Sequence, residues 1–243
     1  MPKVEDCHGP ASAAALAVVR RFEQSPPPPL FRLADPLSAP SLPFFGRDDM
    51  VIYRRSDSGV IEIKMPGVRF DAMEQLAVED TIVKIAALED QRTFEAQSMT
   101  AAIRERGRVQ TLVKLPQGAV EVLGPGGAII GSEEADGLEV AIVTRHREQS
   151  MSSTWRTPDT VIDELFTAFG IPGRDIAASD VRLQFGYFEL SKYDQQSTMR
   201  PVFLATLDLK ADETGIPYRF VTAAAATSAA GVSHGDGLGS WGL

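Results

Sequence analysis

Side chains suited to molecular recognition gather in one polar stretch within residues 185–207, "FGYFELSKYDQQSTMRPVFLATL". Tyrosines offer an apolar body with a polar tip, glutamines offer a donor and an acceptor, and arginine offers a fork of donors. We therefore predict a binding site here, and the alternative is a core-rim tyrosine followed by a solvated loop. The candidate residues of this stretch are Tyr187, Tyr193, Gln195, Gln196 and Arg200.

Two further candidates precede this stretch in the sequence. Trp155 stands just before a predicted helix, where it could cover the same end of the sheet or pack at the helix entry. Arg145 belongs to the basic run Arg145-His146-Arg147 and joins the predicted binding residues. The two arginines would keep His146 neutral near pH 7, as a general base requires, but an exposed strand end of mixed charge is the favoured explanation of the run.

No group of residues predicts catalysis or metal binding. The histidines, at positions 8, 146 and 234, lie far apart in sequence, and the single cysteine, Cys7, cannot form an internal disulfide or a thiolate metal site. Dinucleotide, P-loop, nucleophile-elbow and zinc-protease motifs are all absent from the sequence. The glycines of "GPGGAIIG" predict a turn between strands. We therefore predict no cofactor and no metal, and name no catalytic residue.

Composition narrows the classes of partner. The chain has 243 residues, a net charge of −9 and a pI of about 4.9, which disfavours a general phosphate-binding surface and hence nucleic acid. No run approaches the roughly 18–20 apolar residues that cross a bilayer. The apolar run "AAALAVV" near the N-terminus is too short for a signal peptide. These features predict a soluble, cytoplasmic protein.

The elements expected to position the candidates alternate between helix and sheet. Residues 11–24 predict a helix, with Ser12 as a cap, and prolines between 26 and 43 predict an extended connector or a proline-rich ligand motif. Residues 50–145 predict a meander of antiparallel strands, including a hairpin around a Ser-Asp-Ser-Gly turn and two strands about Glu79-Asp80.

The strongest helical pattern comes next. Thr157 as N-cap, Pro158 at the first position and Gly170 as the stop predict a helix whose apolar face carries five residues. These are Val161, Ile162, Leu165, Phe166 and Phe169. Strands are expected near 180–190, 201–209 and 217–223.

The fold class that follows is α+β, with helices packed on antiparallel sheets and two cystatin-like units in tandem as its finer form. We expect an N-terminal helix and connector over 1–48, a β-rich unit over 49–148, a helix-and-sheet unit over 149–224, and a glycine-, alanine- and serine-rich tail over 225–243.

Two family resemblances accompany these patterns. Residues 137–223 run from "ADGLEVAIVTR" through "TPDTVIDELFTAFG" to "VRLQFGYFEL", "RPVFLATLDL" and "PYRFVTA". This order is similar to PepSY-like and YycI-type modules, in which a cystatin-like helix crosses an antiparallel sheet. Residues 60–143, with "IEIKMPGV" and "GRVQTLVKLPQGAVEV", resemble a small heat-shock (α-crystallin) domain, although that family's I-x-I tail is absent.

The PepSY-like resemblance implies a non-catalytic module that binds a protein or modulates a peptidase. We accordingly expect a binding or regulatory module whose partner is a peptide, a peptidase or a protein subunit. One alternative is a cofactor-free cyclase or isomerase with an apolar pocket between helix and curved sheet, which would take a small apolar molecule. The other alternative is a chaperone-like holdase acting through residues 60–143.

Overall fold

The computed structural model describes 9–33, 51–55, 60–66, 92–93, 108–124, 126–134, 137–143, 145, 147–170, 176–191, 194–209 and 218–229. The chain divides into two compact units. Unit 1 comprises Met1–Leu30, Met151–Gly186 and Arg200–Leu243, and unit 2 comprises Phe31–Ser150 and Tyr187–Met199. Strands β12 (Val181–Phe188) and β13 (Thr198–Leu209) each contribute residues to both units. The domain boundaries expected from the sequence remain a prediction.

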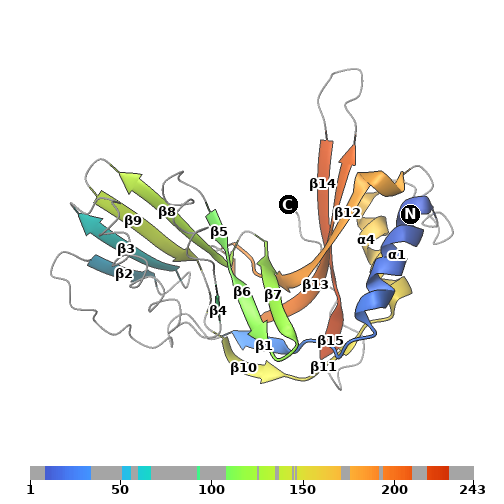
Figure 1. Ribbon diagram of the computed structural model, residues 1–243, viewed down its shortest axis with the longest axis horizontal. Helices are drawn as coiled ribbons and strands as arrows, with labels where there is room; N and C mark the ends of the chain where they lie inside the picture. Colours follow the sequence, from blue (N-terminus) through green and yellow to red (C-terminus); the bar gives the residue numbers. More distant parts are fainter. Residues whose placement is uncertain are drawn as a thin grey trace. The chain divides into compact units, whose positions relative to one another are not determined.

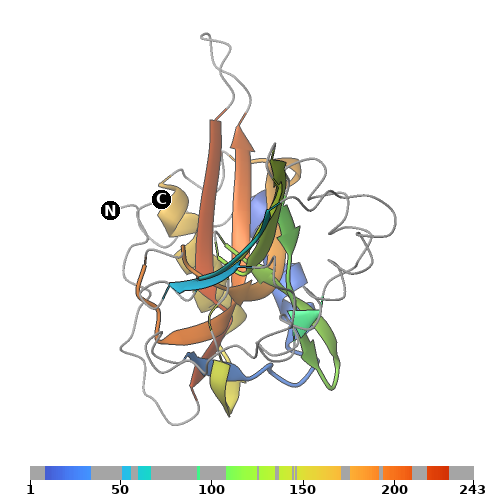
Figure 2. The same cartoon turned by 90° about the vertical axis from the view of Figure 1, so that its left-hand side faces the viewer.

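Unit 1 packs two helices against an antiparallel sheet. Helix α1 (Pro10–Phe22) and helix α4 (Pro158–Phe169) lie side by side, and α4 contacts strand β14 (Tyr218–Ala225) (Figure 1). In the sheet, β13 lies between β12 and β14, and β13 pairs with β14 in antiparallel register from Val202↔Ala225 to Leu209↔Tyr218. Figure 2 shows these two strands running side by side as a long hairpin. This arrangement confirms the predicted α+β class.

The helix predicted from residues 157–170 is confirmed, including its N-cap at Thr157. It spans Pro158–Phe169, Gly170 ends it in a left-handed conformation with φ +66°, and all five predicted apolar residues are buried. The Thr157 carbonyl accepts a hydrogen bond from the Val161 N–H at 3.1 Å, whereas its side chain makes no capping hydrogen bond.

The first helix begins two residues earlier than its predicted cap. Gly9 is the N-cap of α1, and Ser12, in the first turn, accepts a hydrogen bond from the Gly9 N–H through its Oγ at 2.9 Å. The Ser12 hydroxyl also bonds the Gly9 carbonyl at 2.9 Å. Ser12 therefore caps the helix from inside the first turn rather than from in front of it.

The core of unit 1 fills the space beneath both helices. Phe166 of α4 and Phe203 of β13 are almost fully buried, and Phe22 of α1 meets Phe203 edge to face with a centroid distance of 5.4 Å. Phe185 of β12 completes this aromatic cluster at 5.2 Å from Phe203. Burial of such aromatic side chains contributes most of the stability of a small core.

Two remaining strands of unit 1 form a separate ribbon. Strand β11 (Ser153–Trp155) pairs antiparallel with β15 (Thr227–Ala229). The first residues of the expected tail therefore belong to strands, and residues 230–243 lie outside the described residues.

The described part of unit 2 consists of strands and their connections. Its first sheet orders the strands β2 (Val51–Arg55), β3 (Val60–Pro66), β9 (Gly137–Val143), β8 (Ala128–Glu134) and β5 (Arg108–Gln110), all antiparallel. The pairing of β2 with β3 confirms the predicted hairpin. The two strands expected about Glu79-Asp80 lie outside the described residues.

The second set of strands in unit 2 departs from the predicted meander. Strand β1 (Leu30–Leu33) lies between β10 (Arg147–Met151) and the first residues of β13. The last residues of β12 neighbour β7 (Gly118–Leu123), followed by β6 (Leu112–Leu115) and β4 (Arg92–Thr93). The β12–β7 pairing is parallel, with Tyr187 opposite Val122, so the sheets are mixed and not wholly antiparallel.

Candidate functional site

The predicted binding residues fall into both units. Arg145, Tyr187, Gln195 and Gln196 belong to unit 2, whereas Trp155 and Arg200 belong to unit 1. Tyr193 lies outside the described residues. The structure brings Arg145 and Gln196 together around the described residues 189–191 and 194–197, which we call the recognition segment.

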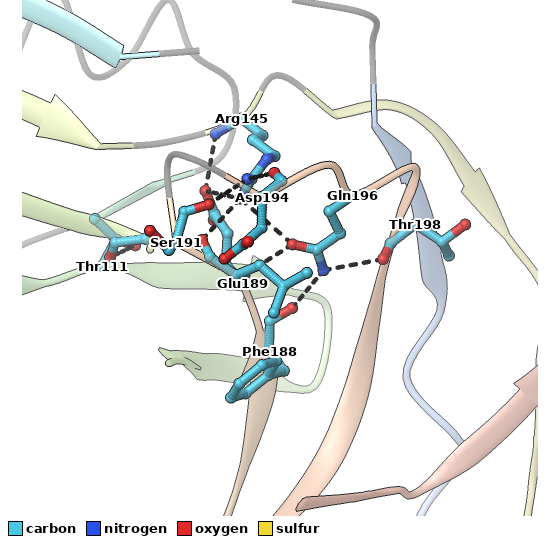
Figure 3. Close-up of polar contacts among 10 residues, drawn as sticks. Thr111, Arg145, Phe188, Glu189, Ser191, Asp194, Gln196 and Thr198 are labelled. Atoms are coloured by element: carbon cyan, nitrogen blue, oxygen red, sulfur yellow. Dashed lines mark hydrogen bonds and ion pairs between the residues drawn. The ribbon is translucent and has the colours of Figure 1, made fainter. Parts of the chain in front are cut away.

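Arg145 holds the recognition segment through backbone carbonyls. Its guanidinium donates from Nη1 to the Leu190 carbonyl at 2.8 Å and from Nη2 to the Ser191 carbonyl at 2.7 Å. Nη2 also donates to the carbonyl of Asp194. Figure 3 shows the guanidinium directed toward these oxygens. A planar fork of donors suits this task, because one side chain binds several acceptors at fixed angles.

Glu189 supplies the negative charge that accompanies Arg145. The Glu189 side chain is 1% exposed and that of Arg145 is 7% exposed, and Oε1 of Glu189 lies 3.9 Å from Nη1 of Arg145. The same Oε1 accepts a hydrogen bond from the Arg145 backbone N–H at 2.9 Å. A buried carboxylate is tolerated only where charge and donors compensate its desolvation, so the two residues depend on each other.

The side-chain amide of Gln196 forms hydrogen bonds with the backbone at both ends of the recognition segment. Its Nε2 donates to the carbonyls of Phe188 at 2.9 Å and Thr198 at 3.0 Å, while its Oε1 accepts from the Leu190 N–H at 2.8 Å (Figure 3). These partners lie on both sides of the segment, so one amide joins the end of β12 to the start of β13.

A glycine-rich turn packs against the other side of the recognition segment. As the glycine spacing predicts, residues 124–127 connect two strands, β7 and β8. The Gly126 N–H donates to the Glu189 carbonyl at 3.1 Å, and the Glu189 N–H donates to the Leu123 carbonyl at 3.0 Å. A Cβ at Gly124 would lie 2.5 Å from the Glu189 carbonyl oxygen, so only glycine permits this approach.

Tyr187 lies in the core of unit 2 and is fully buried. Its ring packs on that of Phe31 with a centroid distance of 5.3 Å. Burial raises the pKa of the Tyr187 phenol well above its ordinary value, and the nearby positive charge of Arg147 opposes this only in part. Tyr187 therefore contributes packing beneath the recognition segment rather than an exposed contact.

This burial predicts how stability responds to alkaline pH. Because the folded state holds the Tyr187 proton more tightly than the unfolded state does, the stabilisation is complete below pH about 10 and is lost as the pH rises further. We expect the free energy of unfolding to fall less steeply above pH about 10 in Tyr187→Phe than in the unmodified protein. Denaturant titrations at a series of pH values measure this slope, and equal slopes would contradict the prediction.

Trp155 and Arg200 occupy different surroundings. The Trp155 indole is partly buried, donates from Nε1 to the Ser25 carbonyl at 2.8 Å and packs against Phe185 at 5.9 Å. These contacts fit the alternative of a packing residue near the start of α4. Arg200 is partly buried and lies in β13.

Three side chains of the recognition segment face solvent. Asp194, Gln195 and Ser197 are exposed, although their neighbour Gln196 is held by the backbone. Sequence reasoning named Gln195 but missed Asp194, Ser197 and the buried Glu189. The available signal for Glu189 was its position at the end of an apolar strand, where a carboxylate requires a partner.

The residues considered for catalysis do not form a site among the described residues. Positions 8, 146 and 234, which carry the histidines, lie outside these residues, and the described part of the chain contains no cluster of metal-ligating side chains. The adjacent carboxylates Asp163 and Glu164 lie on α4, where Glu164 pairs with Arg156 at 2.7 Å. An open groove of about 260 Å³ between α1 and α4 includes Asp159, which pairs with Arg20 at 3.6 Å.

Comparison with known proteins gives no assignment. No protein-family model matches the chain, and no curated protein matches its sequence. Among the described residues, neither helix has the length and apolar content needed to span a bilayer.

Proposed function

We propose that this chain is a non-enzymatic binding module that presents the recognition segment to a protein or peptide partner. The main observation in support of the proposal is that two side chains form hydrogen bonds with the irregular backbone of the recognition segment. Arg145 and Gln196 together bind backbone groups of Phe188, Leu190, Ser191, Asp194 and Thr198.

Such a segment is well suited to binding. Ordering a loop opposes association, so a loop whose backbone is already held in place loses less entropy when a partner binds. The exposed Asp194, Gln195 and Ser197 present a carboxylate, an amide and a hydroxyl. These groups fit a partner surface rich in hydrogen-bond donors.

The PepSY-like resemblance supports the same class of function. Helix α4 packed against β13 and β14 agrees with a helix over an antiparallel sheet, and that family binds proteins without catalysis. The competing enzyme hypothesis requires an apolar pocket beneath α4. Among the described residues, the side chains of Leu165, Phe166 and Phe203 are buried in the core beneath α4, which favours the binding hypothesis.

The proposal is tested by removing the exposed groups without disturbing the buried ones. We expect the double variant Asp194→Ala/Gln195→Ala to keep its stability and to bind its partner about tenfold more weakly. Partners captured from a lysate by the unmodified protein would be identified by mass spectrometry and purified. Calorimetry would then measure their affinity for the unmodified protein and for the double variant.

The matched control is Glu148→Ala/Gln149→Ala, which removes an exposed carboxylate and an exposed amide from β10 of the same unit. This control should bind with unchanged affinity. Equal affinity of the Asp194→Ala/Gln195→Ala protein and the unmodified protein would refute a role for the recognition segment.

A further inference from the structure

The outer edge of β14 in unit 1 carries backbone groups directed away from its neighbour β13. The Ala226 N–H donates to the Pro201 carbonyl at 2.9 Å, in the same register as the β13–β14 pairs. In an antiparallel ladder, residues alternate between those that bond the partner strand and those that point away. Arg219, Val221 and Ala223 therefore direct both N–H and C=O toward the open edge.

One end of this edge is closed. The Ala225 carbonyl also points outward, and it accepts a hydrogen bond from Nη1 of Arg156 at 2.9 Å. Among the described strands, β14 pairs with β13 alone. The open edge is therefore a row of three residues between Tyr218 and Ala225, and such an edge is a template for another extended strand.

We propose that the strand completing this edge is β14 of a second copy of the chain, so that the protein forms a twofold dimer. Antiparallel self-pairing centred on Val221 places Val221 opposite Val221 of the other copy and Arg219 opposite Ala223. Each outward residue then exchanges both of its hydrogen bonds, so every open N–H and C=O of the row is satisfied.

The charges along the edge are compatible with this register. The row has one charged side chain, Arg219, whose partner is an alanine, so that no like charges face each other. Asp208 on β13 accepts hydrogen bonds from Arg219 and Arg182 at 2.6 Å each, and the Arg219 contact holds the pKa of the Asp208 carboxyl below its usual range. Within each copy Arg219 is thus held by Asp208, whose single charge it shares with Arg182.

The helices of unit 1 leave space for β14 of the second copy beside β14. Ala224 is completely buried in the core beneath the helices, whereas Phe220, on the same face of β14, is 42% exposed. The helical layer therefore leaves the first half of β14 uncovered. In the antiparallel pair, that half lies beside the covered half of the other strand, so the two helical layers are offset along the strand direction.

The test uses opposite charges at the dimer centre. Val221→Lys and Val221→Glu each place like charges opposite one another, and each should weaken self-association roughly fivefold in sedimentation equilibrium. An equimolar mixture of the two should associate at least as tightly as the unmodified protein. This recovery distinguishes a lost interface from a lost fold, because a misfolded variant would not recover on mixing.

The control changes the same charges on another strand. Gln184, exposed on β12, is replaced by Lys or by Glu, and both variants should associate as the unmodified protein does. If the unmodified protein stays monomeric as its concentration rises, the dimer is overturned. The outer edge of β14 would then bind an extended segment of another protein. Failure of the mixture to associate would also overturn the dimer. Neither result bears on the recognition segment, which no variant in this test changes.

Discussion

Replacing Arg145 with alanine is expected to lower the free energy of unfolding by about 3–5 kcal/mol. The change removes the Arg145 guanidinium from beside the buried Glu189 carboxylate, and with it the donor that serves the Leu190, Ser191 and Asp194 carbonyls. An uncompensated buried charge costs far more than the pair contributes while it is intact. Chemical denaturation followed by circular dichroism measures the loss.

Two further variants test the cause of that loss. Adding Glu189→Gln to Arg145→Ala removes the buried charge that Arg145 compensated, so the double variant should be more stable than Arg145→Ala alone. Arg182→Ala is the matched control, because Arg182 is also paired with a carboxylate but is 63% exposed, and its loss should change stability little. A small effect of Arg145→Ala, similar to that of Arg182→Ala, would contradict the assignment.

Local sequence patterns were sufficient to predict the helices and strands that are determined by residues close together in the sequence. The helix at Pro158–Phe169 follows from its apolar spacing, its proline start and its glycine stop. The hairpin of β2 and β3 follows from alternation around a turn of small polar residues. In both cases the residues that determine the structure are neighbours in sequence.

Contacts between distant residues could not be predicted in the same way. Arg145 and Glu189 are 44 positions apart, and no spacing rule connects a residue after β9 with one at the end of β12. The parallel pairing of β7 with β12 depends on where the chain returns after α4, which alternation does not determine.

At the candidate site too, the sequence indicated which side chains make hydrogen bonds but not which groups they bind. Side-chain chemistry drew attention to Arg145 and Gln196, because both are strong hydrogen-bonding groups. It could not show that their partners are backbone groups of the chain itself. This is why the exposed Asp194 and Ser197, rather than those two residues, now form the proposed contact surface together with Gln195.

The second large effect concerns Gly124, which has φ +91° and lies against the recognition segment. Gly124→Ala is expected to lower the free energy of unfolding by about 3 kcal/mol or more. An alanine is strained at this φ, and its Cβ would lie 2.5 Å from the Glu189 carbonyl oxygen and 3.0 Å from the Phe188 ring. Because the obstructing atom belongs to the backbone, the segment itself must move.

Gly118→Ala separates backbone strain from this collision within the same unit. Gly118 also has a positive φ, +134°, but a Cβ there meets no atom within 4 Å. Strain alone should cost about 1–2 kcal/mol, so Gly124→Ala should be the more destabilised of the two in denaturant titrations. Its displaced segment should also weaken partner binding, which Gly118→Ala should leave unchanged. Equal losses of stability in the two variants would show that the turn does not support the recognition segment.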